Sequence, residues 1–124
     1  MSDIISGEKM EFENQVQGEK TLCAASVYER KYYLNPEFVS LPTVIQNELK
    51  ATVVMFTEEN GGIIHLVFNG EGDLVIRVEH RSDDFSYDHI GVEFKVRQLL
   101  QEKAELFGQL QTFYHVFIKN DIGL

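Results

Sequence analysis

The sequence predicts a single α+β domain in which an antiparallel, hairpin-based sheet packs against a long C-terminal helix and a second, shorter helix. Apolar residues recur at helical spacing through residues 87–118, two apolar runs flank a glycine-rich loop in residues 63–80, and an apolar stripe follows Pro42. With 124 residues, the chain is long enough for one hydrophobic core and too short for two ordinary domains. Residues 1–20 show no regular period, so we expect a flexible N-terminal arm followed by one domain over residues 21–124.

The longest pattern, over residues 87–118, is typical of one amphipathic helix. Apolar side chains recur there at steps of three and four, which places them on one face. A second apolar stripe lies beside the first, so more than one element must pack on this helix. Lys103 stands at a position expected to be apolar, and we interpret it as the place where the core ends and a partner begins. The two stripes comprise Val92, Val96, Leu99, Leu106, Leu110, Phe113 and Phe117, and Leu100, Phe107, Tyr114 and Ile118.

The second helix is expected to start near Pro42, because proline is well tolerated in the first turn of a helix. An apolar stripe follows, and Gly61 with Gly62 forms a helix stop signal. Residues 51–57 are also rich in β-branched side chains, and Asn60 before Gly61 is a hairpin signal, so a short helix followed by a strand stays an alternative. The continuous helix is favoured.

Residues 63–80 are typical of a β-hairpin. Gly72 can adopt the left-handed backbone that closes a three-residue loop between Asn69 and Asp73. This loop predicts a register in which apolar residues face each other on one side of the ladder. The predicted pairs on that side are Ile64 with Val78, Leu66 with Ile76 and Phe68 with Leu74. An isolated hairpin is marginally stable, so we expect a third strand or a symmetry mate.

The pattern of residues 21–34 fits a helix better than a strand. In a helix, Tyr28 and Tyr32 share one side, whereas in a strand the alternating positions would mix polar and apolar side chains. A helix is therefore favoured here. It should end before Pro36, because proline disfavours helical backbone in the residue that precedes it.

Composition places the chain among soluble globular proteins. Of its residues, 44% are hydrophobic and 25% are charged, and no segment reaches the ~18 consecutive apolar residues of a membrane-spanning helix. The formal net charge of −9 would repel a phosphate backbone, and the densest basic pair is Arg30 with Lys31, so we expect neither nucleic-acid nor membrane partners. Residues 1–20 lack the pattern of a signal peptide, and a single cysteine, Cys23, suits a reducing compartment. These features predict a cytoplasmic protein.

Four segments carry a family resemblance: residues 27–35 (VYERKYYLN), 58–63 (EENGGI), 87–91 (YDHIG) and 102–107 (EKAELF). They resemble an uncharacterised family of small proteins from anaerobic Firmicutes, the Clostridia. The resemblance extends over nearly the whole chain after the N-terminal arm. It implies a bacterial cytoplasmic protein of unknown function, and it supplies no catalytic residue.

The richest polar cluster lies at the predicted junction of the hairpin with the long helix. Five potential metal ligands occur there within ten residues: His80, Asp83, Asp84, Asp88 and His89. Imidazole with carboxylate suits zinc, manganese or iron, and such sites occur in loops at the ends of elements. The spacing matches no established metal motif. The favoured interpretation is that the carboxylates cap the helix, and a metal site is the alternative.

No recognisable catalytic set accompanies this cluster. The sequence contains no phosphate-binding glycine loop, nucleophile elbow or serine–histidine–aspartate order. Cys23 has no activating neighbour in the sequence and is expected to be a small buried apolar residue. His65 and His115 are expected to be surface or partly buried side chains. The sequence therefore favours a non-enzymatic protein-binding or adaptor module without a cofactor; the alternative is a metal-binding protein or small metal-dependent enzyme that uses residues 80–89.

The predicted C-terminal helix also favours a homodimer. About 30 residues of helix would be roughly 45 Å long, more than the ~26 Å diameter of a domain of this size. Its distal end would overhang the core and expose a large apolar patch. A second copy related by a two-fold axis is the simplest cover for it. The patch comprises Phe107, Leu110, Phe113, Tyr114, Phe117 and Ile118.

Overall fold

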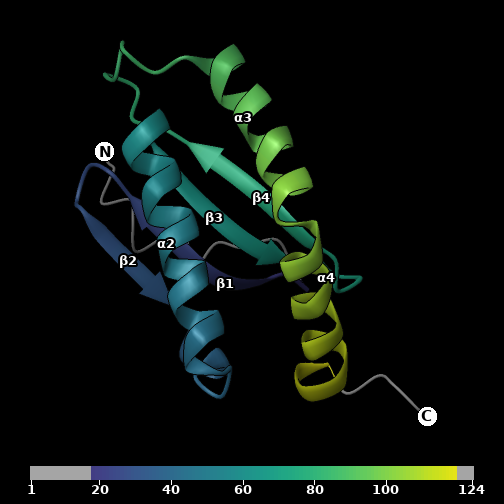
Figure 1. Ribbon diagram of the computed structural model, residues 1–124. Helices are drawn as coiled ribbons and strands as arrows, with labels where there is room; N and C mark the ends of the chain where they lie inside the picture. The colour runs from purple at the N-terminus through teal and green to yellow at the C-terminus, as the bar shows by residue number, and fades with distance from the viewer. Residues whose placement is uncertain (1–17, 120–124) are drawn as a thin grey trace.

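The computed structural model describes residues 18–119, and its centre is a four-stranded antiparallel sheet (Figure 1). In spatial order, the strands are β2 (Lys31–Leu34), β1 (Lys20–Ser26), β3 (Ile63–Phe68) and β4 (Leu74–Glu79). One face of the sheet is covered by three helices: α2 (Thr43–Asn60), α3 (His89–Glu102) and α4 (Ala104–Phe113). The predicted α+β class is therefore confirmed. Most of the predicted N-terminal arm lies outside the described residues.

β3 and β4 form the predicted hairpin in the predicted register. Ile64 pairs with Val78, and the remaining pairs follow from that one. Gly72 has a φ of 87°, and its amide donates to the carbonyl oxygen of Asn69 at 2.9 Å. The Asn69 side-chain oxygen accepts hydrogen bonds from two further loop amides. The expected third strand is β1, which pairs antiparallel with β3.

The prediction of a helix over residues 21–34 is wrong, because these residues form β1, a turn and β2. β1 pairs with β2 on one side and with β3 on the other, and its small side chains Cys23, Ala24 and Ala25 are buried. Because β1 pairs on both sides, its backbone N–H and C=O groups form hydrogen bonds with segments that are remote in sequence. These hydrogen bonds outweigh the local pattern of side chains, which favoured a helix. The turn contains Arg30, whose φ is 55°.

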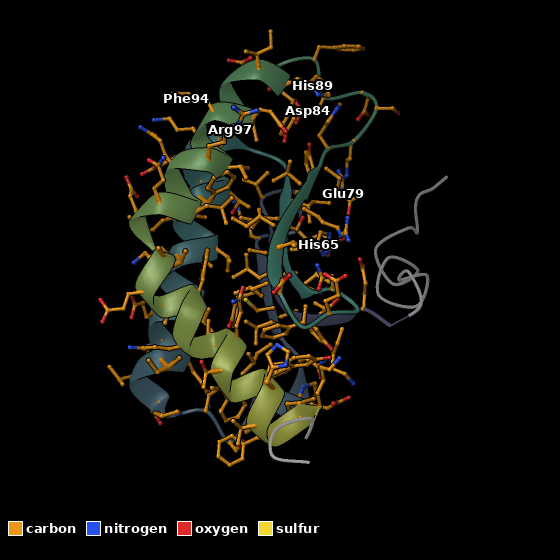
Figure 2. The ribbon with its side chains drawn as sticks, turned by 90° about the vertical axis from the view of Figure 1, so that its right-hand side faces the viewer. His65, Glu79, Asp84, His89, Phe94 and Arg97 are labelled. Atoms are coloured by element: carbon orange, nitrogen blue, oxygen red, sulfur yellow. The ribbon has the colours of Figure 1, made fainter. Side chains whose placement is uncertain are left out.

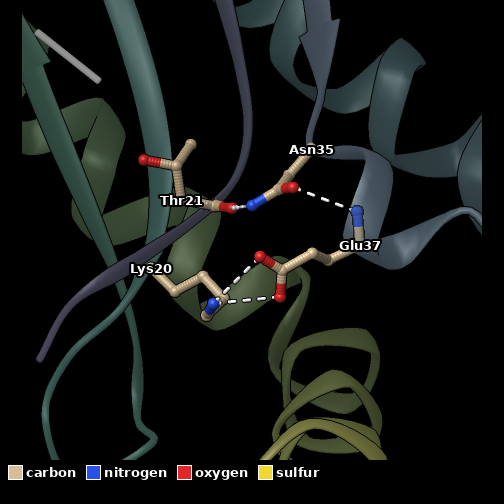
Figure 3. Close-up of polar contacts among 4 residues, drawn as sticks. All are labelled: Lys20, Thr21, Asn35 and Glu37. Atoms are coloured by element: carbon tan, nitrogen blue, oxygen red, sulfur yellow. Dashed lines mark hydrogen bonds and ion pairs between the residues drawn. The ribbon is translucent and has the colours of Figure 1, made fainter. Parts of the chain in front are cut away.

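Polar contacts hold the segment after β2 against β1 (Figure 3). The Lys20 ammonium donates to the two carboxylate oxygens of Glu37 at 2.9 and 3.1 Å. The Asn35 side chain donates to the carbonyl oxygen of Thr21 at 2.8 Å and accepts a hydrogen bond from the Glu37 amide at 3.0 Å. Asn35 therefore caps the short 3-10 helix Pro36–Phe38 and ties it to the sheet. The last residue of this short helix is buried in the core.

α2 is a continuous helix, as favoured, so residues 51–57 are not a strand. Pro42 occupies the position before the first helical residue, one place earlier than predicted, and Gly61 ends the helix with a φ of 79°. The helix packs over β1 and β3. Its buried residues are Leu49, Thr52, Val53, Phe56 and Thr57.

The predicted single helix over residues 87–118 is instead two α-helices joined at Lys103, followed by a π-helical turn at Tyr114–Ile118. Lys103 leaves helical geometry, with a φ of −108° and a ψ of 22°. Its ammonium donates to the half-exposed carboxylate of Glu48 in α2 at 3.2 Å. A buried lysine on the apolar stripe would be costly, and the junction lets the charge reach a partner near solvent. The interruption in the apolar pattern therefore marks a helix junction.

The distal end of the C-terminal helices is covered largely by the same chain. The rings of Phe68 and Tyr114 stack with their centroids 4.1 Å apart, and the ring of Phe38 lies 5.6 Å from that of Phe68. Phe107 is buried too, whereas Phe117 stays 69% exposed. The prediction of a large exposed patch here is therefore wrong, because the 3-10 helix after β2 packs against this end. A homodimer stays a prediction that needs another surface.

The face of the sheet opposite the helices carries polar pairs (Figure 2). His65 and Glu79 lie on this face, and the His65 Nε2 is 2.7 Å from the Glu79 Oε2. Arg77, which pairs with His65 across the ladder, forms an ion pair with Glu19. His65 is 8% exposed. It is therefore more deeply buried than the sequence led us to expect.

Candidate functional site

The loop between β4 and α3 contacts the turn between β1 and β2 through Tyr28. The Tyr28 hydroxyl donates to the Asp84 Oδ2 at 2.6 Å and accepts a hydrogen bond from the Arg81 amide at 3.2 Å. The Arg81 guanidinium lies 4.5 Å from the centroid of the Tyr28 ring, in a cation–π arrangement. Two segments that are distant in the sequence therefore assemble the polar cluster that the sequence singled out.

Hydrogen bonds stabilise the ionised form of Asp84. The Tyr28 hydroxyl, followed by the Ser86 hydroxyl at 2.7 Å, lowers the pKa of the Asp84 carboxyl below its usual value. Burial, and next the hydrogen bond to Asp84, raises the pKa of Tyr28 to about 12. At neutral pH the carboxylate is charged and the phenol is a neutral donor. The loop therefore carries a negative charge at Asp84, whose pKa the nearby His80 also lowers.

His80, which follows β4, and His89, the first residue of α3, bring their rings together. Their Nε2 atoms are 3.0 Å apart, and the ring planes meet at 80°. Tyr87 stacks on the His80 ring with the centroids 4.3 Å apart. The His80 Nδ1 lies 2.8 Å from the carbonyl oxygen of Arg81. These contacts hold the His80 ring in one orientation.

The structure brings two of the five predicted metal ligands into contact, His80 and His89. Asp88 caps α3, as one of the capping residues that the sequence suggested. Asp84 is held by the loop contacts above, and Asp83 is exposed. Within the described part of the chain, no group of three or more histidine, cysteine, aspartate or glutamate side chains is arranged to hold a metal ion.

Cys23 lies in the core between the sheet and the helices. Burial raises the pKa of its thiol to about 12. A cysteine reacts through its thiolate, which this environment suppresses. The expectation of a small buried residue is confirmed.

The outward side of α3 carries exposed apolar side chains (Figure 2). Ile90 is 83% exposed and Phe94 is 60% exposed, and residues four apart share one side of a helix. Phe85, in the preceding loop, is 92% exposed. We call the side of α3 that carries Ile90 and Phe94 the α3 face. It has an open depression of about 460 Å³ lined by His89, Ile90, Glu93, Phe94 and Arg97.

This side of α3 also carries Glu93 and Arg97, so in the sequence it reads as mainly polar. Ile90 and Phe94 lie outside the two predicted apolar stripes, and their spacing of four places both on this side. An apolar pair at this spacing on an otherwise polar side was the available signal. It identifies the α3 face only when the opposite side of the helix is known to be packed in the core.

A second hollow, of about 470 Å³, lies between α2 and α3. Met55, Phe56 and Leu99 contribute its apolar part, and charged side chains of both signs surround them. Two of these charges, Glu48 and Lys103, already pair with each other. We therefore regard the α3 face as the stronger candidate for binding.

Comparison with known proteins identifies the family. A family model described as a family of unknown function (DUF6145) matches residues 19–121, which span all the strands and helices given above. No functionally curated protein and no solved structure matches the chain. Among the described residues, no helix is long and apolar enough to cross a membrane. An origin in the Clostridia and a cytoplasmic location stay predictions. The chain belongs to DUF6145, a family of unknown function.

Proposed function

We propose that this protein is a protein-binding module that uses the α3 face to pair with a second copy of itself. The observation that carries this proposal is the exposure of Ile90 and Phe94 on one side of α3, while Val92 and Leu99 on the other side are buried. Large apolar side chains exposed together mark interaction surfaces, and aromatic anchors carry much of the binding energy. Burying one such side chain contributes roughly 1.5–3 kcal/mol.

The α3 face is self-complementary. In the proposed pairing, the two-fold axis is perpendicular to α3 and the two α3 helices run antiparallel, so residues before the axis in one copy face residues after it in the other. With the axis just after Phe94, Glu93 of one copy lies next to Arg97 of the second copy. Ile90 then lies across from Leu100, which is 40% exposed. Apolar contacts at the centre would be flanked by opposite charges, which favours this register.

The size of the α3 face limits the strength of this pairing. α3 has 14 residues and is therefore about 21 Å long. The area buried between two such helices is therefore at the low end of the range for stable protein–protein interfaces. The net charge of −9 on each copy further opposes association at low salt. We expect a dimer of micromolar affinity at physiological ionic strength.

Sedimentation velocity of the untagged full chain, across micromolar concentrations at physiological salt, tests the proposal. We expect a concentration-dependent dimer, and we expect Phe94→Asp to give a monomer because a carboxylate would be buried without a partner. Val44→Asp is the matched control, since Val44 is 70% exposed on α2 and lies outside the α3 face. The control should dimerise like the natural sequence.

Ile90→Asp should abolish pairing in the same way as Phe94→Asp, and circular dichroism should show that both variants are folded. Two independent substitutions protect the test against a folding defect in one of them. A protein that stays monomeric at its highest soluble concentration would contradict the proposal. A dimer that persists in both variants would contradict it as well, because the contact would then lie elsewhere.

A further inference from the structure

We propose that His80 and His89 bind one divalent transition-metal ion through their Nε2 atoms. The two residues stand where β4 ends and where α3 begins, so two regular elements hold them. The proposal narrows the five-residue cluster to two imidazole ligands and leaves the other coordination positions to water or an external ligand. It does not depend on pairing through the α3 face.

The hydrogen bond of His80 leaves its Nε2 available to a metal ion. A carbonyl oxygen only accepts hydrogen bonds, so the His80 Nδ1, 2.8 Å from the Arg81 carbonyl oxygen, carries a proton. In the neutral ring, Nε2 is then an unprotonated nitrogen that faces the Nε2 of His89. Metal-bound histidines commonly donate their other N–H to a backbone carbonyl, which fixes the ring in place.

The distance between the two nitrogens fits one shared ion. Zinc–nitrogen bonds are about 2.0–2.1 Å long, so two imidazoles at ~90–109° around zinc have their nitrogens roughly 2.8–3.4 Å apart. The Nε2 atoms of His80 and His89 are 3.0 Å apart. The ring centroids are 4.6 Å apart and the planes meet at 80°, so the rings approach at an angle instead of head-on. The two lone pairs can therefore converge on one point.

The charge around the pair favours a cation. Asp84, which accepts hydrogen bonds from the Tyr28 and Ser86 hydroxyls, carries a negative charge in the loop that follows His80. Asp88 directly precedes His89 as the cap of α3. A direct hydrogen bond between the two imidazoles is the competing explanation of their contact, and it predicts no metal affinity. A divalent ion accounts for the contact as well, and the nearby carboxylates would stabilise its positive charge.

Two imidazole ligands favour a particular class of metal ion. Nitrogen ligands suit zinc, cobalt, nickel and copper better than magnesium or calcium, which prefer oxygen. Structural zinc sites have four protein ligands, whereas this site offers two. We therefore expect an exchangeable ion of moderate affinity that is not required for folding.

Calorimetric titration of the untagged full chain with zinc chloride tests the site. We expect one zinc per chain, and binding about tenfold weaker or more in His80→Ala and in His89→Ala. His115→Ala is the control, because His115 packs beside Gly72 at the hairpin loop, away from the pair. This control should bind zinc like the natural sequence.

Nitrogen-15 NMR of the imidazole groups tests the same site without any substitution. Zinc should shift the Nε2 resonances of His80 and His89 and leave those of His65 and His115 in place. Phe94→Asp should retain zinc binding, so failure of the dimer proposal and failure of the metal proposal are distinguishable. Absence of binding at millimolar zinc, unchanged affinity in the double alanine variant, or shifts only at the other two histidines would each overturn the proposal.

Discussion

Tyr28 joins two distant parts of the chain through one hydroxyl group. It donates to Asp84 and accepts from the Arg81 amide, while its ring lies against the Arg81 guanidinium. Asp84 in turn accepts hydrogen bonds from the amide and hydroxyl of Ser86. The loop that presents His80 and leads to α3 is therefore ordered by a residue outside it.

Replacing Tyr28 with phenylalanine should raise the pKa of Asp84 towards its ordinary value of 3.8, because the Tyr28 hydrogen bond is the largest cause of the lowered pKa. A depressed carboxyl pKa stabilises the fold above that ordinary value, and this contribution is lost as the pH falls through the lower folded-state pKa. The variant should lose less stability over that acidic interval. Carbon-13 NMR titration of the carboxyl group measures the change.

Ser86→Ala is the matched control for this titration. Its hydrogen bond is the second cause of the lowered pKa, so the rise should be smaller than in Tyr28→Phe. If the pKa of Asp84 is the same in Tyr28→Phe as in the natural sequence, the hydrogen bond has no role in keeping the carboxylate ionised.

At the scale of elements, the β3–β4 hairpin and the helix junction show how local chemistry sets geometry. The hairpin loop depends on Gly72 in the left-handed region and on the Asn69 side chain, which accepts hydrogen bonds from the amides of Glu71 and Asp73. The junction at Lys103 turns the chain where a charge interrupts the apolar stripe. Both features concern a few adjacent residues. The sequence predicted the hairpin loop, whereas it showed the interruption at Lys103 without identifying it as a helix junction.

Gly72→Ala should destabilise the protein by about 1–2 kcal/mol, since a Cβ is disfavoured in the left-handed region. Its φ is 87°, and a Cβ would lie 2.4 Å from the His115 ring, which would have to move. Gly70→Ala is the control, because a Cβ there meets nothing within 4 Å among residues 18–119 and its φ lies outside the left-handed region. Urea unfolding of both variants measures the difference. Equal stability of the two would show that the loop tolerates a side chain at position 72.

At the scale of the whole molecule, two layers share one core. The helices cover one face of the sheet (Figure 1), and Phe38, Phe68 and Tyr114 connect the 3-10 helix, the sheet and the C-terminal end by ring stacking. Cys23, in the doubly paired strand β1, is fully enclosed by these layers. A probe of Cys23 therefore reports on the integrity of the whole fold.

The Cys23 thiol should be unreactive towards a disulfide reagent in the folded protein and should react fully in urea. Burial blocks access and raises the pKa of the thiol to about 12, so little thiolate forms near neutral pH. Absorbance of the released thiolate measures the rate. Ser40→Cys adds an exposed thiol as the control, and it should react at once in the folded protein. Rapid reaction of Cys23 without urea would show that the two layers separate readily.

Some parts of the candidate sites follow from signals between neighbouring residues, whereas other parts depend on contacts between distant segments. The sequence identified His80 and His89 as potential ligands and aspartates as caps of the following helix, because polar residues at an element boundary form a local signal. It missed the contribution of Tyr28, whose partner Asp84 lies 56 residues away. It also missed the α3 face, since exposure depends on which side of the helix the sheet covers.

By itself, the sequence determined the hairpin and its register, the extent of the helix after Pro42 and the α+β class, because period, loop glycine and proline act over a few neighbouring residues. Only the tertiary structure decided that β1 and β2 are strands, since their stability comes from pairing with remote segments. The tertiary structure also decided that the distal end of the C-terminal helices is covered by the chain's own Phe38 and Phe68. Periodicity records which side of a helix is apolar, but packing between distant segments determines what covers that side.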